Sequence, residues 1–236
     1  MDKRIEQLKI ETENALNEAS RNFPELRLSE HGLALFLGKN YAHPLGRILM
    51  LGLNPGLLKD KPGGTLLTDY AHSYDLLTSN VLIGSPSDFE AKRVRYWRNA
   101  RRCFGATPSL QAAMELATYS FCCPFRTPKW STLTAMQKHS LETYSRPVLS
   151  KILNDCQPLV IIVAGEDARK IVFRSGILTC SEMSTDQHGT KWSMFGARAS
   201  WGAVTVAQLR HFSYFNSIEE LQRCGEWLSQ VLSDVV

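Results

Sequence analysis

Hydrophobic and polar positions divide the chain into short apolar runs and longer stretches in which apolar residues recur at helical spacing. The apolar runs are typical of buried strands and fall at residues 45–53, 116–122, 159–164 and 203–207. Helices are predicted between and around these runs, at residues 5–20, 88–104, 134–154, 166–174 and 217–232. Because apolar runs suit parallel strands covered on both faces, this alternation predicts an α/β fold: a three-layer α/β/α domain with a central, largely parallel sheet.

Residues that begin or interrupt helices add detail to this pattern. Thr134 and Gln137 have the spacing of a capping box, which opens a helix. Pro147 is expected to break or kink that helix, because proline has no backbone N–H. Residues 57–87 are expected to wrap a site as a loop and a short helix, and residues 181–202 to be irregular or a hairpin.

The composition suits one globular unit. The chain has 236 residues, of which 44% are hydrophobic and 21% charged, enough for one sizeable core. We expect a single domain over residues 1–236, with residues 1–44 as an N-terminal helical extension. No run reaches membrane-spanning length and the N-terminus lacks an apolar signal core, so we expect a cytoplasmic protein without membrane association.

Cysteine content and net charge limit the kinds of site that the chain offers. The six cysteines show no C-x-x-C pair and no metal spacing with histidine, so we reject a metal cluster and a disulfide framework. Neighbouring Cys122 and Cys123 are expected to be small buried hydrophobic residues. The net charge of +4 permits an anionic partner without requiring one.

The segment Gly52-Leu53-Asn54-Pro55-Gly56 directly follows the first predicted strand. Its glycines let the backbone bend and approach a ligand closely, and Pro55 makes the turn rigid. Asn54 both donates and accepts hydrogen bonds, and it stands where open α/β folds bind ligands. The alternative is an ordinary strand-to-loop turn, since Asn-Pro and Pro-Gly are common turn pairs.

Two further loops are expected to meet this segment, because the carboxyl ends of parallel strands share one edge of a sheet. The loop after residue 122 brings Phe121 and the rigid stretch 124–128, and the loop after residue 207 brings His211 and Ser213. Asn54 and His211 at the ends of core strands indicate a site at this edge.

These segments, in this order, resemble the uracil-DNA glycosylase superfamily, in particular its mismatch-specific and single-strand-selective branches. Gly52 to Gly56 match the first motif, and His211-Phe212-Ser213 match part of the last one. Residues 159–168 are similar to the family's apolar strand that runs into Gly-x-x-Ala. The resemblance covers roughly residue 45 to the C-terminus and implies a uracil-DNA glycosylase-like fold and hydrolysis of an N-glycosidic bond in DNA.

The resemblance also implies roles for individual residues. Asn54 would position the attacking water and His211 would donate a hydrogen bond to the leaving base, with Asp69 and Asp75 as reserve candidates for water activation. The expected base-binding residues are Gly52, Leu53, Pro55, Gly56, Tyr70, Ser120 and Phe121. The expected DNA-binding residues are Arg126, Lys129, Arg210, Ser213, Tyr214 and Phe215, of which Tyr214 or Phe215 would fill the space left by the extruded nucleotide.

The chain departs from the family at positions that select the base. Phe121 stands where the family commonly has a base-reading asparagine, and Phe212 follows His211 where the family usually has proline. The usual base-stacking phenylalanine has no match, and Tyr70 or Tyr74 would replace it. Phenylalanine cannot reproduce the donor and acceptor pair of an amide, which favours a modified pyrimidine over uracil.

Basic residues gather in the predicted helix 88–104, interleaved with aromatic residues. Two readings stay open, a helix that contacts phosphates and a solvated basic face whose aromatic residues turn to the core.

The first hypothesis is a monofunctional DNA glycosylase that acts without metal or cofactor, as a monomer, with DNA as its partner, and leaves an abasic site. No lysine lies within the matched motifs, so a lyase step is not supported. Defence against modified phage DNA is one role, and repair of uracil or mismatched bases is the alternative. The rival hypotheses are an inactive nucleic-acid-binding relative and a hydrolase of a nucleotide or other small ligand.

Overall fold

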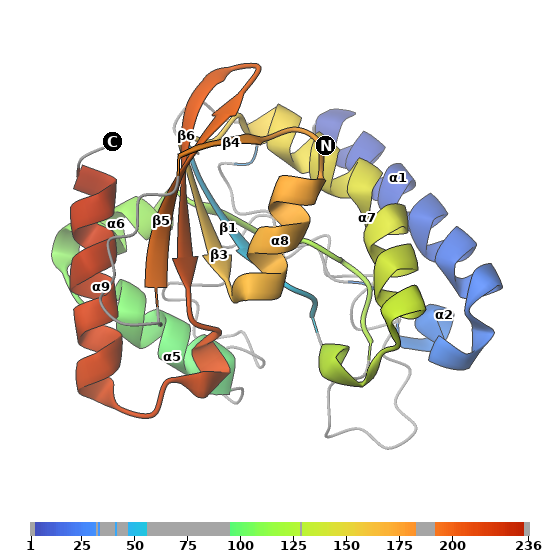
Figure 1. Ribbon diagram of the computed structural model, residues 1–236, viewed down its shortest axis with the longest axis horizontal. Coiled ribbons are helices and arrows are strands. Elements are labelled where there is room, and N and C mark those ends of the chain that lie inside the picture. The colour runs from blue at the N-terminus through green and yellow to red at the C-terminus, as the bar shows by residue number, and fades with distance from the viewer. Residues whose placement is uncertain are drawn as a thin grey trace.

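A mixed, mostly parallel sheet forms the centre of the molecule. The computed structural model describes residues 3–31, 33, 41, 47–55, 95–127, 129–182 and 192–233. Within these residues the sheet has six strands in the order β2-β1-β3-β6-β5-β4 (Figure 1). The strands are β1 (Ile48–Gly52), β2 (Thr118–Phe121), β3 (Val160–Ala164), β4 (Thr179–Glu182), β5 (Trp192–Ala199) and β6 (Gly202–Leu209). The first four in this order are parallel to one another, and β5 is antiparallel to both of its neighbours, β6 and β4.

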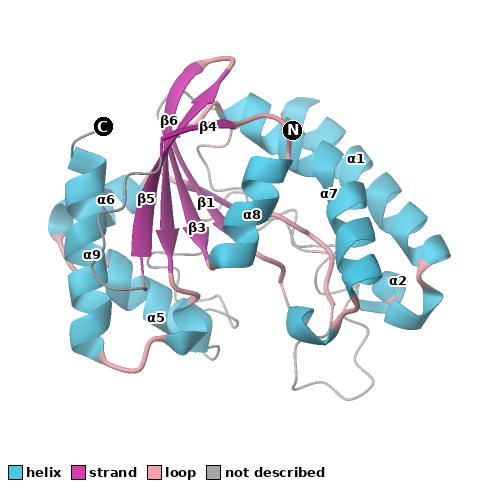
Figure 2. Cartoon of the chain, in the orientation of Figure 1, coloured by secondary structure: helices cyan, strands magenta, loops and turns pink. Residues whose placement is uncertain are grey.

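Helices cover both faces of the sheet, as Figures 1 and 2 show. One face carries α1 (Lys3–Asn22), α7 (Ala135–Cys156) and α8 (Glu166–Arg174), and the other carries α5 (Arg95–Phe104), α6 (Pro108–Glu115) and α9 (Ile218–Ser233). Short helical segments complete the described part: η1 (Pro24–Leu26), α2 (Leu28–His31), η3 (Trp130–Thr132) and η5 (Phe212–Tyr214).

The alternation of side chains along each strand explains the two layers. Leu49 and Leu51 of β1 belong to the core cluster on the α1–α7–α8 side, whereas Ile48 and Met50 belong to the cluster on the α5–α6–α9 side. All residues of β1 and β3 are buried, as expected of parallel strands covered on both faces. The predicted α/β class with a central, mostly parallel sheet is therefore confirmed.

Helix α7 differs from the expectation. The Thr134 capping box is present, with Gln137 bonding back to the Thr134 N–H, so the predicted start of the helix is confirmed. Of the break or kink predicted at Pro147, the break does not occur, because α7 continues through this residue to Cys156. Pro147 lies on the exposed side, while Leu149 and Ile152 face the core. Burial of this apolar side offsets the hydrogen bond that proline removes.

Two other elements were missed or mistaken. Helix α6 has Thr107 as its N-cap and Pro108 in its first turn, a common start signal that was overlooked in so short a helix. Residues 181–202 are not irregular where the structure describes them, since β5 pairs with β6 as a hairpin joined near Gly202. The hairpin alternative is the correct one.

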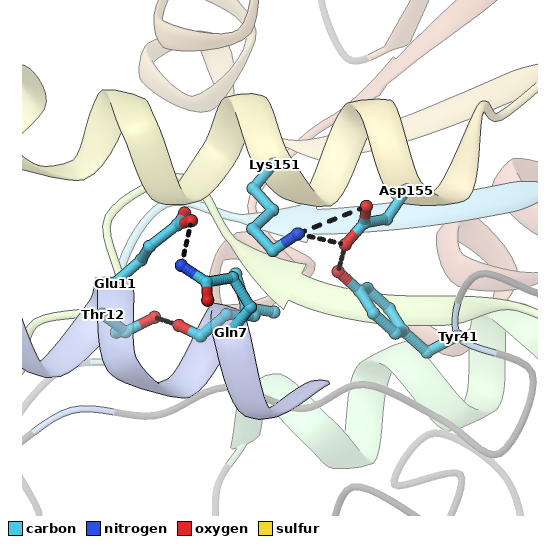
Figure 3. Close-up of polar contacts among 7 residues, drawn as sticks. Gln7, Glu11, Thr12, Tyr41, Lys151 and Asp155 are labelled. Carbon is cyan, nitrogen blue, oxygen red and sulfur yellow. Dashed lines mark hydrogen bonds and ion pairs between the residues drawn. The ribbon is translucent and has the colours of Figure 1, made fainter. Parts of the chain in front are cut away.

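The N-terminal region packs into the same core. Helix α1 lies along α7 and buries Leu8 and Ala19. Figure 3 shows a second attachment, in which the Tyr41 hydroxyl donates to Asp155 Oδ2 (2.6 Å) and Lys151 pairs with the same carboxylate (3.1 Å). Within the residues that the structure describes, no helix is long and apolar enough to cross a membrane.

Candidate functional site

Asn54 and His211 follow two strands that end at the same edge of the sheet. Leu51 of β1 is in register with Val163 of β3, and Val163 with Gln208 of β6. Asn54 comes three residues after Leu51, and His211 comes three residues after Gln208, beyond the carboxyl ends of β1 and β6. Only β3 separates these strands, so two strand spacings, roughly 10 Å, separate their backbones. The structure thus brings the two residues to one edge, as the sequence predicts.

Gly165 occupies the end of β3 between them. Its φ of +105° lies in the region that favours glycine, and its N–H donates to the Leu209 carbonyl (2.8 Å), tying β3 to β6. A side chain at this position would approach the His211 Cβ to 3.8 Å. The positive φ, and not a lack of space, therefore explains glycine at this position.

The loop after β2 holds the first loop in place. Cys122 and Cys123 donate through their backbone N–H groups to the carbonyls of Gly52 (2.8 Å) and Leu53 (2.9 Å). The Asn54 Nδ2 donates to Thr127 Oγ1 (2.9 Å). This bond fixes the orientation of the amide and leaves the Asn54 Oδ1, to which no described residue donates, as an acceptor.

Arg126 also joins the two loops, which corrects its expected role in contacting DNA. Its Nη1 donates to the Pro55 carbonyl (3.2 Å), and the residue is only 1% exposed. A guanidinium buried at this depth braces the first loop and does not face a phosphate backbone. Lys129, two residues past Thr127, is exposed and stays available to an anion.

Gly52 and Phe121 form the aromatic end of the site. They are paired in register, and a Cβ on Gly52 would lie 2.9 Å from the Phe121 ring and from the Tyr119 hydroxyl. Phe121 is 5% exposed and packs edge-on against Tyr119 (5.3 Å between ring centroids). It therefore offers an apolar ring and no hydrogen bond at this position.

Ser120 does not share that surface, which corrects its place among the base-binding residues. Side chains of neighbouring strand residues point to opposite faces, so Ser120 faces the α7 side while Phe121 faces the α5 side. Ser120 is fully buried. His211 packs against Tyr96 of α5, on the same side as Phe121.

His211 is partly buried and neutral at pH 7. Its ring lies against Tyr96 (4.9 Å between centroids) and Tyr214 (5.5 Å). Desolvation lowers the pKa of His211 from 6.5 to about 4. The backbone N–H of Ser213 donates to His211 Nδ1 (3.4 Å). Nδ1 is therefore the unprotonated nitrogen, and the Nε2–H is the donor that the ring offers to a ligand.

The loop that carries His211 is anchored by α5. Asn99, which is 5% exposed, donates through Nδ2 to the carbonyls of Phe212 (2.7 Å) and Phe215 (3.4 Å). Phe212 is fully buried and makes edge contacts with Tyr96 and Phe104 of the same helix. Phenylalanine after the histidine thus serves as a core anchor of the loop.

Glu220 of α9 ties both ends of this loop. Its carboxylate, 7% exposed, pairs with Arg210 Nη1 (3.6 Å) and accepts from the Asn216 N–H (3.4 Å). Arg210, an expected DNA contact, is thereby paired within the protein while about a third of its side chain stays exposed.

The two proposed wedge residues differ in exposure. Tyr214 is 62% exposed and lies beside the His211 ring. Phe215 is 2% exposed and stacks on Phe212 (5.8 Å between centroids), so it packs under the loop and is wrong as a wedge. Ser213 is partly buried, with its N–H bonded to His211.

Several expected site residues lie outside the described residues: Gly56, Asp69, Tyr70, Tyr74 and Asp75, with the rest of the stretch 57–87. Of the basic helix, Arg98 and Arg102 on α5 are exposed, while Tyr96 and Phe104 turn to the core. In its described part, α5 therefore has exposed arginines on one side and buried aromatic residues on the other.

In the described part of the chain, no three His, Cys, Asp or Glu side chains gather as metal ligands would. The free cysteines of this part are buried: Cys103, Cys122, Cys123, Cys156 and Cys224. Burial raises the pKa of Cys123 to about 11 and that of Cys122 further, so both stay protonated, as small buried residues do.

Four positions that shape the site carry no motif in the sequence: Tyr96, Asn99, Thr127 and Glu220. Tyr96, Asn99 and Thr127 each contact a residue more than 70 positions away, so only the folded arrangement reveals them, whereas Glu220 acts on nearby Arg210 and Asn216. No protein-family model matches this chain, and no curated protein matches it.

Proposed function

We propose that this protein is a monofunctional DNA glycosylase with a uracil-DNA glycosylase-like fold. It hydrolyses the N-glycosidic bond of a non-canonical base in DNA and leaves an abasic site. The observation that supports the proposal is that Asn54 and His211 follow the carboxyl ends of β1 and β6, two parallel strands that only β3 separates in the sheet.

The proposed role of Asn54 is to hold the attacking water. Departure of the base generates an oxocarbenium-like sugar, which a weakly activated water attacks readily. A neutral amide is a poor base, but its carbonyl oxygen can hold that water. The bond from Asn54 Nδ2 to Thr127 supports this role, because it turns Oδ1 away as the acceptor.

The proposed role of His211 is to donate a hydrogen bond to the leaving base. Negative charge develops on a carbonyl oxygen of the base as the bond breaks, and one well-placed donor there is worth about 3 kcal/mol. A neutral imidazole that donates from Nε2 suits this task. The lowered pKa and the Ser213 N–H bond to Nδ1 support that state.

The base is proposed to be a modified pyrimidine. Phe121 supplies an apolar ring where an amide would read the edge of uracil, so selection at this position depends on shape and stacking. Such bases occur in the DNA of phages, and defence against them is the proposed role. Repair of uracil or mismatched bases is the alternative.

DNA is proposed to reach the site over the two loops that carry exposed side chains. Lys129 would contact a phosphate and Tyr214 would fill the space of the extruded nucleotide. Both lie on loops joined to the site residues, on the β2 side and the β6 side respectively.

The test is release of base from a panel of DNAs that carry uracil, mismatched thymine and several hypermodified pyrimidines. Released bases are identified by mass spectrometry, and abasic sites by strand scission in mild alkali. We expect release of at least one modified base and an intact strand before alkali. No release from any member of the panel by folded protein would contradict the proposal.

A second candidate is an inactive relative that binds nucleic acid, which the apolar Phe121 favours. It predicts DNA binding that falls steeply with salt concentration. The Asn54→Ala variant would bind as tightly as the wild type, and neither protein would release a base. The same panel, with a binding assay at two salt concentrations, separates the two candidates.

A further inference from the structure

The peptide group that joins Phe212 and Ser213 has both of its polar atoms engaged. Its carbonyl accepts from Asn99 Nδ2 (2.7 Å), and its N–H donates to His211 Nδ1 (3.4 Å). The two bonds run in the same direction, from the amide through the peptide to the imidazole. Hydrogen bonds arranged in such a series polarise and strengthen one another.

Asn99 is built into the fold at this point. It is 5% exposed and lies on α5, three residues after Tyr96, whose ring contacts His211. A buried amide must be paired, and its second bond to the Phe215 carbonyl (3.4 Å) anchors the far end of η5. The helix therefore presents one residue to the ring of His211 and another to the peptide that bonds the ring.

We propose that Asn99 is a positioning residue that acts through the 212–213 peptide to hold His211 with Nδ1 as acceptor and Nε2–H as donor. Loss of the Asn99 N–H frees this peptide to turn, and the Ser213 N–H then leaves Nδ1. The catalytic consequence rests on the proposed function, whereas the effect on His211 itself does not.

Neighbouring contacts supply a matched control. Phe104 lies on the same helix and packs edge-on against Phe212 (5.5 Å between centroids), but it makes no hydrogen bond to the loop. Phe104→Leu weakens the packing of this segment and leaves the bond from Asn99 in place. A role of Asn99 in packing alone would make the two substitutions alike.

Nuclear magnetic resonance of the full chain tests the proposal on two atoms. In Asn99→Asp, which keeps the size of the side chain and removes its N–H donor, the Ser213 amide is expected to exchange with solvent roughly tenfold faster. The ¹⁵N chemical shift of His211 Nδ1 is expected to move to the value of an unprotonated ring nitrogen that accepts no hydrogen bond. Asn99→Ala is expected to change the Ser213 exchange rate and the Nδ1 shift in the same directions. Phe104→Leu is expected to change neither of these two quantities.

Wild-type values of both readouts in a folded Asn99 variant would overturn the proposal, as would equal changes in Phe104→Leu. If neither Asn99 variant folds, the wild-type chain decides. There the ¹⁵N shifts of the His211 ring are expected to show the neutral form with the proton on Nε2, and a proton on Nδ1 would refute the assignment.

Activity separates this proposal from the proposed function. On a DNA from which the wild type releases base, Asn99→Asp is expected to lower kcat about tenfold or more and to leave KM within about twofold. The reason is that the His211 Nε2–H, which Asn99 positions, donates to the departing base. If the wild type releases no base from any DNA, the proposed function fails, and the two magnetic resonance readouts still decide the role of Asn99.

Discussion

At the scale of single residues, His211 is the group whose environment matters most. Tyr96, Tyr214 and the strand end around it remove water, and no described carboxylate forms an ion pair with it. The neutral ring is therefore the stable form through neutral pH, which suits a hydrogen-bond donor to a leaving group rather than a general acid.

This burial predicts a pH-dependent stability. Between pH 6.5 and about 4, the unfolded chain binds a proton at His211 that the folded chain does not. The free energy of unfolding contributed by this residue thus falls as the pH is lowered across that window, by up to about 3 kcal/mol, and is constant below it. Urea unfolding of wild type and His211→Gln from pH 7 to pH 4 measures the effect. The same pH dependence in both proteins would count against it.

At the scale of elements, the loop after β2 determines how the first loop presents Asn54. Two backbone bonds from Cys122 and Cys123, the Arg126 bond to Pro55 and the Thr127 bond to Asn54 join the two loops. The N-terminal region reaches the same loop through a bridge between Leu33 and Phe125. The amide is thus oriented by segments remote in the chain.

Thr127 is expected to control activity more than stability. Thr127→Val removes the hydroxyl that accepts from Asn54 Nδ2 and keeps the shape of the side chain, so the amide loses its fixed orientation. We expect base release to slow about tenfold to a hundredfold, with a loss of about 1 kcal/mol in unfolding free energy. Thr127→Ser keeps the hydroxyl and is expected to retain most activity. Equal rates in the Val and Ser variants would argue against this role for Thr127.

At the scale of the whole molecule, the pattern of apolar residues predicts the parallel core well. Each buried strand consists of a continuous run of apolar residues, which is visible in the sequence itself. Strands β1, β3 and β6, and helix α8, fall where the apolar runs place them. Helix α7 did not break at Pro147, since the packing of a 22-residue helix outweighs one lost hydrogen bond.

The site was predictable in part for the same reason. Asn54 and His211 follow predicted strands, so topology alone brings them to one edge. The burial of Arg126 and Phe215 and the bonds from Asn99 depend on contacts between segments far apart in the chain. No local pattern records such contacts, so the sequence predicts neither the burial of Arg126 nor the role of Asn99.

The most direct measurement of the central claim is the single-turnover rate of base release by Asn54→Ala and His211→Ala, on whichever DNA the wild type cleaves. Each is expected to be slower by about a hundredfold or more while folding is kept, because the proposed function assigns positioning of the water to Asn54 and stabilisation of the departing base to His211. Asn17→Ala and His139→Ala, exposed residues of the same types on α1 and α7, are the matched controls and are expected to keep the wild-type rate. Wild-type rates in folded Asn54→Ala and His211→Ala would contradict the account.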